Sequence, residues 1–197
     1  MNPEDILKYM NAQRAGAIAQ HDLDNCKQPS TALIVAVDVH GGFSKDGKIP
    51  WNYPSDLKHF KSLTKGHICV MGRATYDSLP LPKKSGGHIL PDRKCFVLTS
   101  SDLPRSDAIR VKSYNDIFKH FDDADWAKTI FFVGGEQVYT DAISFVDTAY
   151  ITAVNTDANC DRFVPMDWIL RTFDLTSQTS CAKEPNIKFL TYTRSRR

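Results

Sequence analysis

Apolar residues along this chain occur mainly in short runs of strand length, separated by segments with a helical pattern. The first run, residues 32–37, is continuously apolar, which is typical of a strand covered on both faces. Similar runs predict strands at residues 67–71, 95–98, 109–111, 129–133 and 149–154. Helices are predicted at residues 54–65, 115–121 and 136–143, and a short one begins at residues 72–75. Two last runs, residues 173–180 and 187–193, flank a turn and predict an antiparallel pair.

These elements predict an α/β fold. We expect a single domain over residues 31–197, built on a mostly parallel, twisted sheet with an antiparallel C-terminal edge. Residues 1–30 differ in character, because residues 6–19 predict a weakly amphipathic helix and residues 20–30 are polar and rich in turn formers. We expect this N-terminal extension either to dock on the domain or to be partly disordered.

Asp56 stands out in the helix predicted at residues 54–65. Leu57, Phe60 and Leu63 have the helical spacing of a buried stripe, and Asp56 lies on the same face, four residues before Phe60. Burial there would raise the pKa of the carboxyl group unless a partner compensates it. The alternative is that Asp56 only favours the helix dipole from the first turn. The helix alone leaves both interpretations open.

Two strand-to-helix turns carry glycine, at residues 72–75 (Gly-Arg-Ala-Thr) and 134–137 (Gly-Gly-Glu-Gln). Glycine lets the backbone approach a ligand closely, so two such turns at one sheet edge suit a cofactor with a pyrophosphate group. Neither turn matches the common nucleotide-binding fingerprints. Arg73, together with residues 99–101 after the next strand, is a candidate for binding a further phosphate, such as the 2′-phosphate of NADPH.

The composition excludes several other classes of function. The 25 lysines and arginines nearly balance the 23 aspartates and glutamates, and a net charge of +2 does not favour a nucleic-acid or membrane partner. Five cysteines without a C-x-x-C pair and six scattered histidines predict reduced thiols and no metal site. Because no membrane span or signal peptide is recognisable, we expect a cytoplasmic protein.

Several segments together resemble the dihydrofolate reductase family. They are residues 47–61, 70–78, 90–94 and 133–139, which occur in the family's order within a resemblance that covers about residues 32–195. The most specific feature is the pair Pro50-Trp51 ahead of the helical pattern Asp56-Leu57-x-x-Phe60. The resemblance implies NADPH-dependent reduction of 7,8-dihydrofolate to 5,6,7,8-tetrahydrofolate, by hydride transfer to C6 and protonation at N5.

The resemblance also implies roles for residues on the substrate side. Asp56 would pair with the 2-amino group and N3 of the pterin, Thr152 would join this network, and Trp51 would hold an ordered water; these three are the expected catalytic residues. Asp56 would orient and polarise the ring, with water as the proton donor. The expected substrate-binding residues are Ile34, Asp56, Leu57, Phe60 and Thr152, together with Arg93 for the α-carboxylate of the glutamate tail.

On the cofactor side, the resemblance implies a nicotinamide bordered by Ala36 and Ile49 and covered by a mobile loop at residues 42–48. It assigns the phosphates to residues 73–75, the 2′-phosphate to Thr99 and Ser100, and the adenine end to Lys112, and it implies a cis peptide between the two adjacent glycines. The full expected set for NADPH is Ala36, Gly42, Ser44, Lys48, Ile49, Gly72, Arg73, Ala74, Thr75, Thr99, Ser100, Lys112, Gly134, Gly135, Glu136, Gln137, Val138 and Tyr139.

Some residues depart from the family pattern. Ser44 follows an aromatic residue in the loop, Tyr53 replaces a common leucine, and Glu136 places an acid where the pyrophosphate would lie. Residues 81–89 resemble an insertion near the expected exit of the folate tail.

Two alternative functions are weighed beside the main one. They are a pyrimidine reductase of riboflavin biosynthesis and a non-catalytic nucleotide-binding component tethered through residues 1–30. We expect a monomer whose partners are small molecules, with residues 1–30 available for an extra contact.

Overall fold

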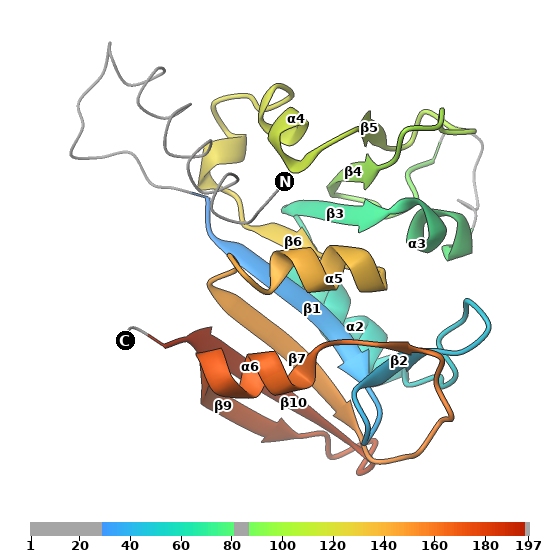
Figure 1. The fold of residues 1–197 in the computed structure, drawn as a ribbon, viewed down its shortest axis with the longest axis vertical. Coiled ribbons are helices and arrows are strands. Elements are labelled where there is room, and N and C mark those ends of the chain that lie inside the picture. Colours follow the sequence, from blue (N-terminus) through green and yellow to red (C-terminus); the bar gives the residue numbers. More distant parts are fainter. Residues whose placement is uncertain (1–28, 81–86, 196–197) are drawn as a thin grey trace.

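The computed structural model describes residues 29–80 and 87–195, so residues 1–28 of the predicted extension (residues 1–30) and most of the predicted insertion lie outside the described residues. Its centre is an eight-stranded sheet of order β5-β4-β3-β6-β1-β7-β10-β9 (Figure 1). The strands are β1 (Thr31–Val37), β3 (Ile68–Gly72), β4 (Lys94–Leu98), β5 (Ile109–Val111), β6 (Ile130–Phe132), β7 (Thr148–Val154), β9 (Phe173–Ser180) and β10 (Ile187–Arg194). All neighbouring strands are parallel except β10, which runs antiparallel to β7 and β9. The expected fold class is confirmed.

Helices lie on both faces of this sheet. They are α2 (Pro54–Thr64), α3 (Arg73–Ser78), α4 (Tyr114–Phe118), α5 (Glu136–Ala142), α6 (Met166–Thr172) and the short 3-10 helix η1 (Asp125–Ala127). A separate two-stranded ribbon joins β2 (Gly42–Ser44) to β8 (Arg162–Phe163). The sequence analysis predicted neither the ribbon strands β2 and β8 nor α6 and η1. The two ribbon strands are too short to show a periodic pattern.

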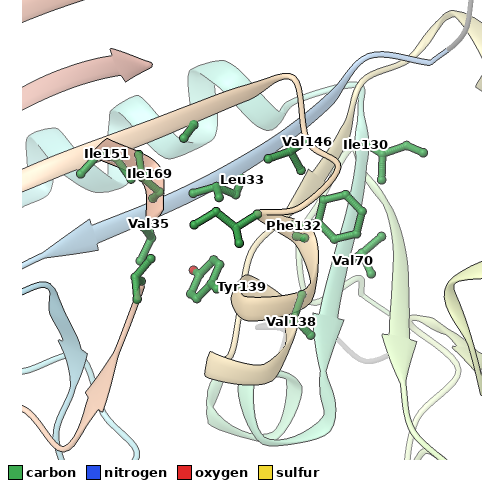
Figure 2. Close-up of a cluster of buried hydrophobic side chains, with 14 of the residues drawn as sticks. Leu33, Val35, Val70, Ile130, Phe132, Val138, Tyr139, Val146, Ile151 and Ile169 are labelled. Atoms are coloured by element: carbon green, nitrogen blue, oxygen red, sulfur yellow. The ribbon is translucent and has the colours of Figure 1, made fainter. Parts of the chain in front are cut away.

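The core consists of two clusters, one on each face of the sheet. Along β1, Leu33 and Val35 belong to one cluster and Ala32 and Ile34 to the other, as expected for a strand covered on both sides. The first cluster includes side chains of α4, α5 and α6, and Figure 2 shows Val138 and Tyr139 of α5 among its members. The second cluster is covered by α2 and α3.

The expected stripe on α2 is only partly buried. Phe60 and Leu63 pack against the second cluster, whereas Leu57 is 59% exposed. The prediction of a buried stripe is therefore wrong for Leu57. Only the later turns of α2 contact the core, so the first turns, which carry Asp56 and Leu57, are left at its margin.

Candidate active site

The two glycine turns meet where the neighbouring strands β3 and β6 end. The backbone N–H of Gly72 donates to the carbonyl oxygen of Gly134 at 2.7 Å, and the Gly134–Gly135 peptide is cis. Gly134 has a φ of +114°, and a Cβ atom there would lie 3.2 Å from the Tyr139 hydroxyl and 3.3 Å from Thr75 Oγ1. Glycine is therefore required by both backbone conformation and space. The expected proximity of the two turns is confirmed.

A cavity of about 720 Å³ opens beside these turns, between the first residues of α3, α4 and α5. Of the residues expected to bind a cofactor, those that line this cavity are Gly72, Arg73, Ala74, Thr75, Lys112, Gly135, Glu136, Gln137 and Val138. It also contains residues that the sequence analysis missed, namely Leu98, Ser113, Tyr114, Asn115 and Asp141. Their one sequence signal is the pattern Ser113-x-x-Asp116, which forms a capping box at the start of α4.

Arg73 is held at the margin of this cavity. Its Nε donates to Asp77 Oδ2 at 2.7 Å, and its Nη1 donates to the carbonyl oxygen of Asp102 at 3.0 Å. Thr99 and Ser100 follow β4, whose last residue Leu98 is the register partner of Gly72, so these segments start side by side. Neither Thr99 nor Ser100 lines the cavity itself.

Glu136 lines the cavity, yet its carboxylate is bonded to the neighbouring ribbon. Its Oε1 accepts from the backbone N–H of Phe163 at 3.3 Å, and its Oε2 lies 3.8 Å from Arg162 Nε. These contacts turn part of the acidic charge toward β8. Gln137 donates to Asp141 Oδ1 at 2.8 Å. The first turn of α5 contains the acid Glu136 and no lysine or arginine.

The loop expected to cover the nicotinamide is held by two carboxylates. Asp38 Oδ1 accepts from the backbone N–H groups of His40 at 2.9 Å and Gly42 at 2.8 Å, and Asp161 Oδ2 accepts from that of Asp46 at 2.9 Å. Burial opposes the charge on Asp38, but these backbone donors lower its pKa below the ordinary value. The sequence analysis missed Asp38, whose position directly after β1 was its only signal.

The other expected loop and nicotinamide residues lie at the ends of β1 and β2. Ala36 is half-buried and is the register partner of Thr152, whereas Ile49 is 61% exposed and Lys48 is exposed. Gly42 and Ser44 form the ribbon with β8. The buried Tyr139 donates from its hydroxyl to the carbonyl oxygen of Ile34 at 3.0 Å.

Asp56 is half-buried in the first turn of α2 and has a neutral partner. The Thr152 hydroxyl of β7 hydrogen-bonds its carboxyl group. Burial raises the pKa of the Asp56 carboxyl group. The hydrogen bond from Thr152 and the charge of His59 lower this pKa, whereas the charge of Glu184 raises it further. Within residues 29–80 and 87–195, no lysine or arginine forms an ion pair with Asp56. Asp56 is thus more than a first-turn acid, because its charge is partly desolvated and has no cationic partner.

A second buried acid, Asp125, differs from Asp56 because two lysines compensate the cost of burying its charge. Asp125 is fully buried and accepts from Lys128 Nζ at 2.8 Å and from Lys94 Nζ. Burial acts against its charge, but the two lysines hold the pKa of Asp125 below its ordinary value. Asp56 lacks such cations, so its site retains capacity for a donor-rich, cationic group.

Trp51 and Arg93 are two further expected site residues that carry hydrogen-bond donors. The Nε1 atom of Trp51 is buried and has no hydrogen-bond partner among the described residues. Arg93 is fixed to the C-terminal half of α2 by bonds from Nε to Thr64 Oγ1 at 2.8 Å and from Nη2 to the Lys61 carbonyl at 3.3 Å. Its guanidinium also lies over the ring of Phe60, 5.7 Å from the centroid. Each terminal nitrogen carries a second N–H, so a carboxylate can still be bound.

Among the described residues, no helix is long or apolar enough to cross a membrane, and no group of His, Cys, Asp and Glu side chains could hold a metal ion.

The bond between Thr152 and Asp56 yields a prediction that needs no ligand. The hydroxyl donates to the carboxylate and favours its charged form, so Thr152→Val should raise the pKa of Asp56 further. A ¹³C NMR titration of the side-chain carboxyl carbons, assigned with Asp56→Asn, measures this shift. Thr176→Val is the matched control, because Thr176 is an exposed threonine of β9. An unchanged or lowered pKa in Thr152→Val would contradict the described bond.

Comparison with known proteins supports one family throughout. The family model for dihydrofolate reductase matches residues 30–195. Dihydrofolate reductase of Bacillus subtilis is 34% identical over 135 residues, which cover 68% of this chain and 74% of that protein. Its counterpart in Staphylococcus aureus strain Mu50 is 33% identical and covers 68% and 77%. A solved structure of Enterococcus faecalis dihydrofolate reductase, complexed with NADP(H) and RAB-propyl, superposes with a TM-score of 0.69 at 30% identity and covers 85% of this chain and 98% of that one. The chain therefore belongs to the dihydrofolate reductase family.

Proposed function

We propose that this protein reduces 7,8-dihydrofolate to 5,6,7,8-tetrahydrofolate with NADPH, and that Asp56 orients the pterin ring. The single observation that carries the proposal is the half-buried Asp56 carboxylate, which has Thr152 as a neutral partner and no ion pair with a lysine or arginine among the described residues. NADPH, when bound, supplies the hydride that reduces C6. The protein's own residues bind the two molecules, orient them and exclude water.

Asp56 and Thr152 provide a paired acceptor site for the pterin edge. A carboxylate accepts two hydrogen bonds side by side, which matches an amino group next to a ring N–H. Binding such a donor pair would relieve the desolvation that raises the pKa of Asp56. Trp51, whose buried Nε1 has no partner among the described residues, is placed to hold a water beside the ring. In this scheme Asp56 polarises the ring while water donates the proton to N5.

The remaining substrate contacts are apolar, with one cation at the far end. Ile34 of β1 and the side chains of Leu57 and Phe60 on α2 would wall the pterin and benzoyl groups. The exposure of Leu57, which core packing does not explain, fits this role. Arg93 would bind the glutamate tail carboxylate, because Thr64 and Lys61 fix its guanidinium without neutralising it.

NADPH would occupy the cavity between α3, α4 and α5. A volume of about 720 Å³ suits a dinucleotide segment, and Arg73 and Lys112 supply positive charge along its lining. Residues 72–75 and 134–139 would surround the phosphates, Thr99 and Ser100 would meet the 2′-phosphate, and Ala36, Ile49 and the loop at residues 42–48 would border the nicotinamide.

The two alternative functions are set aside. The family match spans residues 30–195, which include the Trp51 and Asp56 segment that pyrimidine reductases of riboflavin biosynthesis lack. A non-catalytic role accounts neither for the partly desolvated acid Asp56 nor for the buried Trp51 donor that has no partner among the described residues.

We further propose that residues 31–197 form the catalytic domain, that it works as a monomer and that residues 1–30 are appended to it. Two observations support this division. The family match begins at residue 30, and β1 begins at Thr31.

Replacing Asp56 separates its catalytic role from its role in folding. Asp56→Asn should lower kcat/KM for dihydrofolate at neutral pH by several kcal/mol of transition-state stabilisation, which is about 100-fold or more. Because the folded state raises the pKa of Asp56, its ionised form costs stability, and that cost develops as the pH rises from the ordinary value through the folded pKa. The variant should therefore be at least as stable as the parent at neutral pH, and the difference should narrow in acid. Chemical denaturation at several pH values tests stability; near-normal turnover of Asp56→Asn would refute the assignment.

Glu136 should weaken the binding of NADPH. Glu136→Gln keeps an acceptor for the Phe163 N–H but removes a negative charge next to the cavity, so the Kd for NADPH should fall about two- to five-fold at low ionic strength and less at high salt. Isothermal titration at both salt levels measures the effect. Asp167→Asn, on an exposed acid of α6, is the matched control. Equal affinities for the variant and the parent at low salt would place the pyrophosphate elsewhere.

Removing residues 1–28 tests the proposed division of the chain. The cut spares Ser30, whose carbonyl accepts from the Ile130 N–H at 2.8 Å beside β1. Turnover and melting temperature should be unchanged, and light scattering should give the mass of one subunit with and without the segment. A scrambled extension of the same composition serves as the control. Loss of activity, or a change in assembly, would show that the segment belongs to the working unit.

A further inference from the structure

The first turn of α2 is capped from a distant part of the chain. Pro54 occupies its first position, and Tyr53, at the N-cap, provides no side-chain hydrogen bond. The backbone N–H of Ser55, which would otherwise need a partner, donates to Glu184 Oε2 at 3.0 Å. Glu184 stands 129 positions away in sequence, in the turn between β9 and β10. The helix that carries Asp56 is therefore held by the C-terminal hairpin.

Further contacts join the C-terminal hairpin to α2 and β7 near Asp56. The Glu184 backbone is fixed by its own N–H bond to the Cys181 carbonyl at 3.3 Å and by the Ile187 N–H bond to its carbonyl at 3.0 Å. Three residues after Asp56 on the same helix, the ring of His59 contacts Phe189 of β10 in a tilted arrangement, with 4.1 Å between centroids. Phe189 is the register partner of Thr152, which bonds Asp56. The β9–β10 hairpin, strand β7 and helix α2 thus all contribute groups that act on the Asp56 carboxylate.

The groups that act on Asp56 come from each element packed around it. Thr152 of β7 bonds the carboxyl group, His59 is the nearby basic group on α2, and Glu184 of the hairpin turn is the nearby acid. Burial raises the pKa of the Tyr139 phenol on α5, and the charge of Asp56 raises it further, so the phenol stays neutral. Glu184 is therefore the acidic member of this set, and its charge opposes ionisation of Asp56.

We infer that Glu184 is a positioning residue for the reaction: it caps the first turn of α2 and places a second negative charge beside Asp56. The capping bond orders the helix start from which Asp56 projects. The charge keeps the carboxyl group of Asp56 protonated to a higher pH than burial alone would. This inference goes beyond the proposed function, and it rests on that function only where turnover is measured.

Two substitutions separate the cap from the charge. Glu184→Gln removes the charge but keeps an oxygen that accepts from Ser55, whereas Glu184→Ala removes both. We expect the pKa of Asp56, followed by ¹³C NMR in the protein without ligands, to fall in both variants, because a neighbouring negative charge is lost. Hydrogen exchange at the Ser55 amide should accelerate in Glu184→Ala and stay near the parent rate in Glu184→Gln. Asp174→Asn, which removes an exposed acid at the other end of β9, should change neither quantity.

Kinetics supply the second measurement. The pH profile of single-turnover NADPH oxidation with dihydrofolate should move to lower pH in Glu184→Gln, with little change in KM, whereas Glu184→Ala should also lose kcat. An unmoved Asp56 titration in Glu184→Gln, or an equal shift in Asp174→Asn, would overturn the inference. A parent protein that fails to reduce dihydrofolate would overturn the proposed function instead, while the NMR and exchange measurements would still decide the role of Glu184.

Discussion

The candidate site depends on one carboxylate that no lysine or arginine neutralises within the described part of the chain. Asp56 is half-buried, its hydroxyl partner Thr152 is neutral, and the charge of Glu184 opposes its ionisation. Asp125, in contrast, is fully buried and forms ion pairs with two lysines, Lys94 and Lys128. A desolvated acid without a cation costs stability, and such a cost persists where a ligand provides the missing partner. The proposed pterin-binding role of Asp56 rests on this imbalance.

The mostly parallel sheet brings many of the residues expected to bind the cofactor together at one edge. Parallel strands end at one edge, so the turns after β3 and β6 meet through the Gly72–Gly134 bond and border the cavity. β1 lies between β6 and β7, and its register places Ala36 beside Thr152. The expected nicotinamide border and the hydroxyl that bonds Asp56 are thus fixed on neighbouring strands.

The sequence predicted the parts of this arrangement that depend on local pattern. Continuous apolar runs predicted β1 and its neighbours, and the two glycine turns were expected at one edge, where they lie. Leu57 was assigned to a buried stripe because helical spacing cannot show where a helix extends past the core. Asp38 and the cavity residues before α4 were missed, since their roles come from backbone bonds and loop packing. The roles of Trp51, Arg93 and the cofactor residues rest on the family resemblance and stay predictions.

The contact between Glu184 and Ser55 could not be predicted from the sequence. Nothing in the turn after β9 marks an acid as a helix cap, because the helix that it caps lies 129 residues earlier. The bond exists only because the register of β10 on β7 brings the hairpin turn to the start of α2. A local cap, such as serine at the N-cap, would hold the helix without adding a charge. An acid that reaches across the fold does both, so the same side chain that orders the helix also opposes ionisation of Asp56.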